Sequence, residues 1–398
     1  MSEGLMENGG LSVENGGSAW IETSLGKIST DISYGYTESA NSEPVGPKFL
    51  RITDIASGRL EWDNVPYCPI TTENLEKYLL KTGDIVIART GATTGSTYTI
   101  KAKDPKNVVF ASYLIRYQID KSLADPFFVD FVLRSYYWAG FVDGIKGGSA
   151  QPGANAKQLA SFEFPLPPLP EQKAIAEVLS ALDDKIDLLH RQNKTLEQMA
   201  ETLFRQWFVL EAGEDWEEGV LGDVIEIYDS KRVPLSKMQR NKMKEGVLYP
   251  YYGAATIMDY VNDYIFDGEY ILLGEDGTVR TSEGHPVLQY ATGKFWVNNH
   301  THIFQAKPPY NNFFIWNYLS KKNIDRIITG AVQPKINQTN LKSLEFPIFP
   351  KELVSNYIEI TNSQFDKINK NKAQIRTLES LRDTLLPKLM SGEIRVKM

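Results

Sequence analysis

The first residues to weigh are those whose type and spacing could support metal chemistry. His300 and His302 stand two apart in the segment NNHTHIF, and His285 lies upstream. In a strand, positions two apart share one face, so the pair could offer two ligands to a metal ion. The sequence points to no third ligand, and hydrogen-bonded structural histidines are the commoner arrangement. We therefore expect no metal site.

Three further segments match catalytic motifs only in part. RTGATTGST (89–97) is rich in glycine and threonine but lacks the lysine of a nucleotide-phosphate loop. GEDG (274–277) offers two carboxylates without the further acid or lysine expected of a nuclease. KPPYNNFF (307–314) is close to the Asn-Pro-Pro-Tyr motif of amino-group DNA methyltransferases, but Lys307 stands where asparagine is needed. The sequence predicts no catalytic residue and favours a binding protein.

One segment, SKRVPLSKMQRNKMK (230–244), is strongly basic and contains no acidic residue. The whole chain has a formal charge of −7, which argues against a surface that coats nucleic acid but leaves room for a local basic face. Phosphate binding depends on where the cations sit, so an anion-facing loop is favoured over a merely solvated one. Its basic residues are Lys231, Arg232, Lys237, Arg240, Lys242 and Lys244.

Length and composition limit what must position these residues. A chain of 398 residues is long enough for about two domains, and 42% hydrophobic with 23% charged residues is typical of globular proteins. The first 18 residues are acidic and glycine-rich, unlike a signal peptide, and no run approaches the ~18 apolar residues of a membrane span. We expect a disordered lead over 1–18 and a cytoplasmic protein. Cys68 is the one cysteine, so no disulfide can form within the chain.

The chain carries the same phrase twice. QPGANAKQLASFEFPLPP (151–168) and QPKINQTNLKSLEFPIFP (333–350) align at an offset of 182 residues, and each leads into a long segment of helix formers. Because Gln151 and Gln333 recur, with Asn155 and Asn337 behind them, these residues are poor candidates for distinguishing different targets. A helix cap, a turn or a shared phosphate contact suits them better.

The two long segments predict helices that pair with each other. Over 171–208 the apolar residues alternate at steps of four and three, which is a heptad seam interrupted at Asn193. The second copy has a looser stripe, with Gln364, Asn371 and Arg382 at seam positions. Each stripe needs a partner, and duplicated halves related by a pseudo-twofold axis would make the helices antiparallel. The residues predicted to pair the helices are Ile175, Leu179, Leu182, Ile186, Leu189, Asn193, Leu196, Leu203, Ile368, Ile375, Leu378 and Leu385.

The two blocks between these helices share an order of elements. Each has a β-rich middle (83–100 and 268–284) followed by a helical stretch (125–137 and 310–322). The predicted fold class is α/β, with two similar α/β domains joined by two long antiparallel helices in a coiled coil and an internal pseudo-twofold repeat. The expected boundaries are 1–18 for the lead, 19–170 for the first domain, 171–210 for the central helix, 211–350 for the second domain, and 351–398 for the distal helix and C-terminal tail.

Three features together resemble the specificity subunit of type I restriction-modification systems. They are FPLPPLPEQKAIAEVLSALDDKIDLL (164–189), the repeated phrase and the ending LLPKLMSGEIRV (385–396), and the resemblance covers nearly all of the chain after about residue 18. It implies two target recognition domains that each read half of a bipartite DNA site. It also implies that the central and distal helices set the spacing and dock two methyltransferase subunits through the helix-pairing residues.

The resemblance implies further partners and cofactors for the complex, but none of the cofactors for this chain. The assembly would methylate adenine with S-adenosylmethionine and, with motor-nuclease subunits, cleave double-stranded DNA using ATP and magnesium. This chain would be non-catalytic and would not contact a membrane. Two other classes stay open, namely a coiled-coil adaptor that holds two protein-binding domains and a nuclease that acts alone.

DNA contacts are expected from loops of both domains, with basic side chains on phosphates and with amides or arginine on base edges. In the first domain the predicted contacts are Tyr34, Tyr36, Thr37, Arg89, Thr93, Thr94 and Lys146. In the second they are Lys231, Arg232, Lys237, Arg240, Lys242, Lys244, Tyr251, Tyr252, Arg280 and Lys335.

Overall fold

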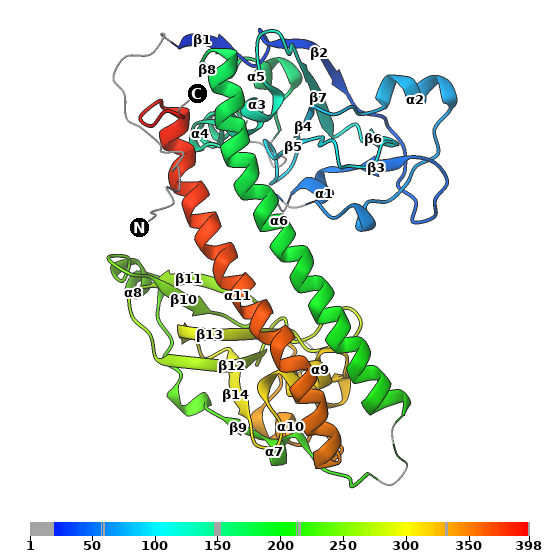
Figure 1. The fold of residues 1–398 in the computed structure, drawn as a ribbon, viewed down its shortest axis with the longest axis vertical. Coiled ribbons are helices and arrows are strands. Elements are labelled where there is room, and N and C mark those ends of the chain that lie inside the picture. Colours follow the sequence, from blue (N-terminus) through cyan, green and yellow to red (C-terminus); the bar gives the residue numbers. More distant parts are fainter. Residues whose placement is uncertain are drawn as a thin grey trace, which may run out of the picture. The chain divides into compact units, whose positions relative to one another are not determined.

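The computed structural model describes residues 20–396 except 57, 59, 147–152, 212, 214–215 and 331–332. The expected N-terminal lead and Gln151 lie outside the described residues. The chain divides into two compact units, 1–187 with 376–398, and 188–375 (Figure 1). Among the described residues, no helix is both long and apolar enough to cross a lipid bilayer.

The first unit is built on a four-stranded antiparallel sheet in the order β2-β7-β4-β5. The central strand β4 is buried along its whole length, with Ile85 and Ile87 in one apolar cluster and Val86 in another. Both faces of the sheet are therefore covered. The strands are β1 Ile21–Ser24, β2 Ser29–Tyr34, β3 Lys48–Leu50, β4 Asp84–Ala88, β5 Thr97–Thr99, β6 Val108–Phe110, β7 Leu114–Ile119 and β8 Glu163–Leu166.

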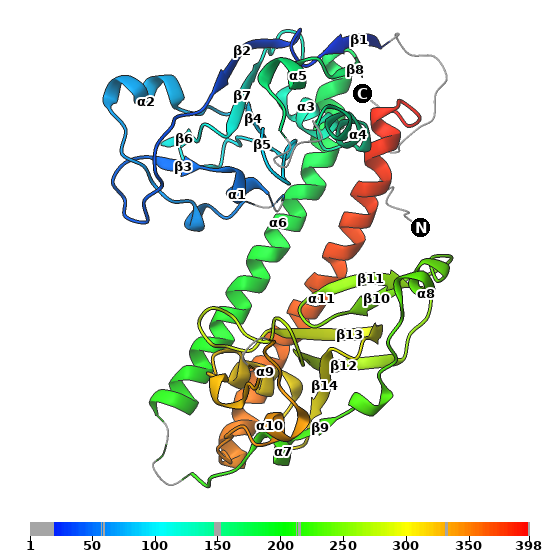
Figure 2. The same ribbon diagram turned by 180° about the vertical axis from the view of Figure 1, so that it is seen from behind.

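Short helices and two smaller strand pairs complete this unit. Strands β3 and β6 pair in parallel, and β1 pairs antiparallel with β8. Figure 2 shows these elements from behind. The helices are α1 Ile52–Ile55, η1 Trp62–Asn64, α2 Thr72–Tyr78, α3 Pro126–Val132, α4 Tyr136–Ile145 and α5 Ala156–Ala160.

The second unit holds a six-stranded sheet in the order β11-β10-β13-β12-β14-β9. In β12, Ile271 and Leu273 face one apolar cluster while Leu272 faces another, which is the alternation expected of a strand covered on both sides. The strands are β9 Ile225–Ile227, β10 Tyr249–Tyr252, β11 Ile257–Val261, β12 Phe266–Gly274, β13 Leu288–Val297 and β14 Thr301–Ala306. The helices are α7 Leu221–Val224, η3 Asp229–Lys231, α8 Lys237–Lys242, α9 Asn312–Ser320, η4 Asp325–Ile327 and α10 Gln338–Lys342.

The repeated phrase has the same local structure in both units. Asn155 caps α5 by accepting from the backbone N–H of Gln158 at 2.9 Å, and Asn337 caps α10 by accepting from that of Asn340 at 2.8 Å. An asparagine at this position satisfies a backbone donor that the helix leaves unpaired. These hydrogen bonds show that the recurring asparagine acts as a helix cap.

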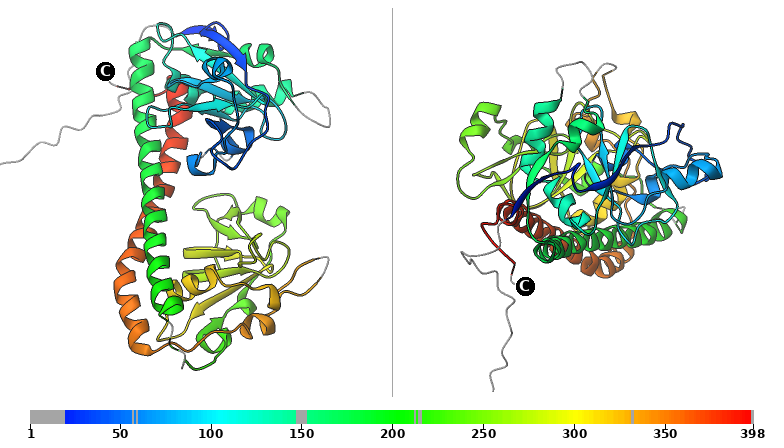
Figure 3. Two further views of the ribbon diagram at one scale, coloured as in Figure 1. Left: turned by 90° about the vertical axis from the view of Figure 1, so that its right-hand side faces the viewer. Right: turned by 90° about the horizontal axis from the view of Figure 1, so that it is seen from above.

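Two long helices follow the two copies of the phrase. The first, α6, covers Leu169–Arg205 and continues into a π-helical turn at Gln206–Leu210, and the second, α11, covers Lys351–Met390. In each unit a segment of α6 lies beside a segment of α11 (Figures 1 and 3). In the first unit Asp183 pairs with Arg382, and in the second Asn193 bonds to Asn371, so rising numbers in α6 meet falling numbers in α11. The helices are antiparallel, as predicted.

Most of the predicted pairing residues are withdrawn from water. Ile175, Leu179, Ile186, Leu189, Asn193, Ile368, Ile375 and Leu385 are buried, and Leu182, Leu196, Leu203 and Leu378 are half-buried. Two of the three polar positions that loosen the second stripe have partners on α6, namely Asn193 for Asn371 and Asp183 for Arg382, whereas the buried Gln364 Oε1 has no hydrogen-bond partner among the described residues. The role of these residues in docking other subunits stays a prediction, as do the domain boundaries.

Candidate nucleic-acid interface

Two residues predicted separately as DNA contacts lie together in the first unit. Arg89 directly follows β4. Its guanidinium lies over the ring of Tyr34, the last residue of β2, with the guanidinium carbon 5.0 Å from the ring centroid. The Tyr34 hydroxyl accepts a hydrogen bond from the Ala156 backbone N–H at 3.1 Å, which holds the exposed ring in place. A planar cation stacked on a fixed ring has a defined direction.

The other predicted contacts of the first unit differ in how accessible they are. Tyr36 is half-buried and packs on Tyr78, whereas Thr37 is exposed. Thr93 is half-buried, and Thr94 is buried with its hydroxyl donating to the Gly91 carbonyl at 2.7 Å. Lys146 forms an ion pair with Asp143 at 3.0 Å. Thr37 and Arg89 are thus better placed for a ligand than Thr94 is.

The basic segment of the second unit is partly neutralised by an acid from another strand. Asp259 of β11 accepts a hydrogen bond from Arg240 at 2.9 Å and also pairs with Lys244. The hydrogen bond from Lys244 lowers the pKa of Asp259 to about 2. Lys237 and Lys242 of α8 stay exposed. The segment has no acid of its own, but a strand outside it supplies a counter-charge to Arg240 and Lys244. Its contact with DNA stays a prediction.

Three predicted contacts of the second unit are held within the fold: Tyr251 and Tyr252 are buried, and Arg232 is half-buried and hydrogen-bonded. Arg232 donates to the Glu275 carboxylate and to the Thr301 carbonyl, both at 2.7 Å. Tyr251 is fully buried and its hydroxyl accepts from the Leu235 N–H at 2.9 Å, while the neighbouring Tyr252 is also buried. In this structure these three side chains pack and form hydrogen bonds within the second unit. Their contact with DNA stays a prediction.

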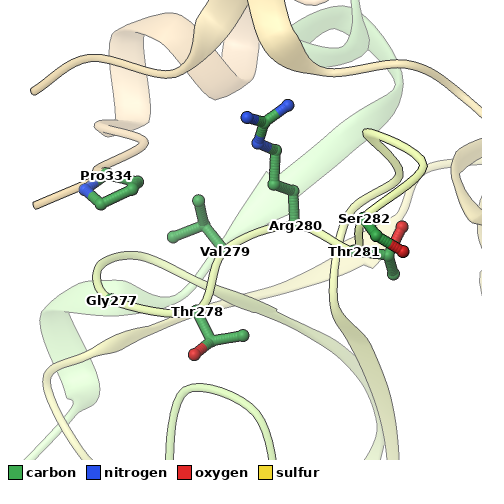
Figure 4. A pocket seen from close by; sticks show the side chains of 7 residues that line it. All are labelled: Gly277, Thr278, Val279, Arg280, Thr281, Ser282 and Pro334. Atoms are coloured by element: carbon green, nitrogen blue, oxygen red, sulfur yellow. The ribbon is translucent and has the colours of Figure 1, made fainter. Parts of the chain in front are cut away.

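The remaining basic residues of this unit vary in their partners. Lys231 is exposed and lies over the Tyr228 ring at 4.9 Å. Lys335 is 3.3 Å from the Glu275 carboxylate, and Arg280 pairs with Asp325. Arg280 also lines a depression of about 310 Å³ formed by residues 277–282 and Pro334, in which Val279 faces Pro334 (Figure 4).

The structure also supplies acids beside one of the histidines considered as a metal ligand. Asp229, Glu275 and His302 bring one ligand atom each to within 4.8 Å of one another, a grouping hidden by their separation in sequence. His302 Nδ1 lies 2.6 Å from Asp229 and its Nε2 lies 2.8 Å from the Ile336 carbonyl. Burial would raise the pKa of Asp229, but the hydrogen bond from His302 holds it below its usual value. With Glu275 already bound to Arg232, the three side chains form a structural network.

Comparison with known proteins identifies the family. The family model for the type I restriction modification DNA specificity domain matches residues 41–198 and 213–379. The chain belongs to this family. Its members supply specificity and are generally not catalytic. The first matched segment contains strands β4, β5 and β7 of the four-stranded sheet, and the second contains the whole six-stranded sheet, so the predicted family and fold class are both confirmed.

Two relatives and one solved structure of the family match between about half and nearly all of this chain. The type I restriction enzyme MjaIX specificity subunit of Methanocaldococcus jannaschii is 25% identical over 348 residues, which cover 79% of this chain and 76% of that protein. The HindI specificity subunit of Haemophilus influenzae is 28% identical over 197 residues, covering 48% and 41%. The type I restriction-modification S subunit from M. genitalium has a similar fold, with a TM-score of 0.58 at 18% identity over 97% of this chain and 98% of that one.

Proposed function

We propose that this specificity subunit lets a type I restriction-modification complex recognise a bipartite, asymmetric DNA site, each recognition domain reading one half. The observation that carries this proposal is the combination of a shared corner with different exposed side chains. In both units an asparagine of the repeated phrase caps a short helix. The exposed side chains differ, because the first unit presents Arg89 over Tyr34 and the second presents Lys237 and Lys242. A common scaffold with different surfaces suits two different half-sites.

The long helices have the second role in this proposal. They set the distance between the half-sites and dock two methyltransferase subunits. Several apolar side chains on their outer faces support a docking role, because exposed apolar groups on an otherwise polar helix favour protein contact. These residues are Leu188 and Met199 on α6 and Ile360 and Leu381 on α11.

The chemistry in this proposal belongs to other subunits. The methyltransferase subunits would bind S-adenosylmethionine and methylate adenine in the cytoplasm. The motor-nuclease subunits would use ATP and magnesium to cleave unmodified DNA. This chain supplies recognition and geometry alone.

Mapping methylated adenines tests the proposal directly. Cells that express the methyltransferase subunit with this chain should carry methylated adenine at one bipartite sequence, and cells without this chain should lose that methylation. A control variant with charged residues at Leu182 and Leu189, where the helices pack, should lose it as well. Methylation that keeps its sequence preference without this chain would contradict the proposal.

The exposed lysines of α8 offer a test on the binding surface. Replacing Lys237 and Lys242 by alanine should weaken binding of DNA by the methyltransferase complex and reduce the slope of log affinity against log salt by roughly 1 to 2, since each phosphate contact contributes about 0.9. Lys342 and Lys351 are exposed lysines elsewhere in the chain, and their double alanine variant is the matched control. An unchanged slope in the α8 variant would show that this helix does not meet phosphate.

A further inference from the structure

The loop after the central strand is fixed to the repeated phrase in the same way in both units. In the first unit the Ala154 N–H donates to the Arg89 carbonyl at 2.9 Å, and in the second the Ile336 N–H donates to the Glu275 carbonyl at 2.8 Å. Residues 154 and 336 are related by the offset of the repeated phrase. Arg89 and Glu275 therefore occupy one structural position, which we call the corner position.

A second pair of hydrogen bonds gives the same equivalence. The Arg89 N–H donates to the Tyr113 carbonyl at 3.0 Å, and the Glu275 N–H donates to the His300 carbonyl at 2.9 Å. The backbone at the corner position is thus held from both sides in each unit. A side chain that starts from a backbone fixed in this way has less freedom to lose when it binds a ligand.

The two side chains at the corner position have opposite charge and different partners. The Glu275 carboxylate lies 2.7 Å from Arg232 and 3.3 Å from Lys335, so the second unit neutralises it internally. Arg89 lies over the Tyr34 ring and forms no ion pair with any residue that the structure describes. Other arginines of the first unit do pair with a carboxylate, namely Arg51, Arg116, Arg134, Arg382 and Arg395.

The state of Arg89 points to an external acceptor. Its guanidinium carries five N–H donors in one plane, and the residue is half-buried just after the end of β4. Tyr34 and Tyr113, which flank it, are both exposed, so two accessible aromatic rings lie beside Arg89. A planar set of donors that starts from a fixed backbone suits a planar group with two acceptors side by side.

We propose that Arg89 is a specificity-determining residue of the first recognition domain, donating to O6 and N7 of a guanine in the major groove. Tyr34 is its positioning residue. This inference rests on the proposed function and adds the residue and the base to it. Among the bases, guanine alone offers two acceptors on its major-groove edge, and arginine is the side chain that matches them. The second domain has Glu275 at the corner position and does not read guanine from there.

The test compares Arg89→Lys and Arg89→Ala in the assembled methyltransferase, with a plasmid library in which the bipartite site is randomised. Lysine keeps the charge but loses the planar pair of donors. Both variants should reduce discrimination at one base pair of one half-site by about ten- to a hundred-fold. The other half-site should keep its preference. Lys121→Ala, an exposed lysine after β7, is the control and should match the unmodified protein.

The position of Tyr34 provides a second measurement. Tyr34→Phe keeps the ring under Arg89 but loses the hydrogen bond that holds it, so it should relax the preference less than Tyr34→Ala does, and both should act at the same base pair as the Arg89 variants. If Arg89→Lys keeps the full preference while Arg89→Ala weakens all sequences equally, Arg89 meets phosphate and the inference is overturned. If the unmodified protein directs no sequence-dependent methylation, the proposed function itself has failed.

Discussion

Asp183 is the residue whose removal should most clearly weaken the attachment of the first recognition domain to the helix pair. Its carboxylate, 12% exposed, accepts from Arg134 at 2.6 Å and from Arg382 of α11 at 3.0 Å. Burial would raise its pKa, but the hydrogen bond from Arg134 lowers it below the usual 3.8. Asp183 therefore stays ionised and joins three elements of the first unit.

The size of the effect follows from the number of bonds lost and the partners left behind. A hydrogen bond to a charged group contributes about 1.5–3 kcal/mol, so two give roughly 3–6 kcal/mol. Arg134 keeps Asp130 at 3.5 Å, and Arg382 keeps Asp383 at 2.8 Å, so neither guanidinium loses all its counter-charge. Asp183→Ala should therefore lower the free energy of unfolding of the first unit by about 2–3 kcal/mol.

The neighbouring Asp184 provides a matched control. It is 59% exposed and pairs with Lys103 at 2.8 Å, an exposed ion pair of the kind that contributes about 0–1 kcal/mol. Urea unfolding gives the free energies, and hydrogen exchange of α3, α4 and the C-terminal turns of α11 shows where protection is lost. Equal destabilisation by Asp183→Ala and Asp184→Ala would refute the assignment of the buried carboxylate as the attachment point.

The same carboxylate gives a pH dependence with a defined sign. Because the folded pKa of Asp183 is lowered, its contribution is present above the unfolded value near 3.8 and is lost as the pH falls through the folded pKa. The stability difference between the unmodified protein and Asp183→Asn should stay constant at neutral pH and shrink below about pH 3.8. A difference that shrinks above pH 5 would mean that another group titrates.

Two further predictions concern buried polar groups. Asn193→Leu leaves the Asn371 amide with only its longer hydrogen bond to Gln192 at 3.3 Å and should lower stability in urea by about 1–2 kcal/mol. The double change of Asn193 and Asn371 to leucine should restore it, and a double variant as unstable as the single one would contradict this. Burial raises the pKa of Cys68 to about 11, so iodoacetamide at pH 8 should modify it slowly in the folded protein and rapidly in urea. Mass spectrometry measures both rates, and fast modification of the folded protein would show that the thiol is accessible.

Features that repeat along the chain could be predicted from the sequence, because their physics is local. The heptad steps gave a helix over 171–208, and the structure has α6 over Leu169–Arg205 before its π-helical turn. Two of the polar interruptions in the second stripe could be located but not explained from the sequence, since their partners lie on the other helix. Asn371 needed Asn193, and Arg382 needed Asp183.

The residues that contact DNA were harder to predict from the sequence, because the exposure and pairing of a side chain depend on residues far away in the chain. The segment 230–244 has no acid of its own, yet Asp259 reaches Arg240 and Lys244 from β11. Tyr251 has the amphipathic character of a contact residue but is buried. The pairing of β10 with β11 places both Tyr251 and Asp259, and the composition of a short sequence segment gives no sign of such pairing. The remaining DNA contacts stay predictions.

The corner position shows that the repeat in the sequence aligns the two copies of the phrase but not the loops that pack against them. The phrase recurs at an offset of 182, but Arg89 and Glu275 are 186 apart and Tyr113 and His300 are 187 apart, so no single offset aligns the loops. Backbone hydrogen bonds align them where sequence cannot. In the proposed function, a shared backbone position with side chains of opposite charge would let the two domains prefer different bases. The repeated phrase would then belong to the shared scaffold, and specificity to the side chains that differ between the two domains.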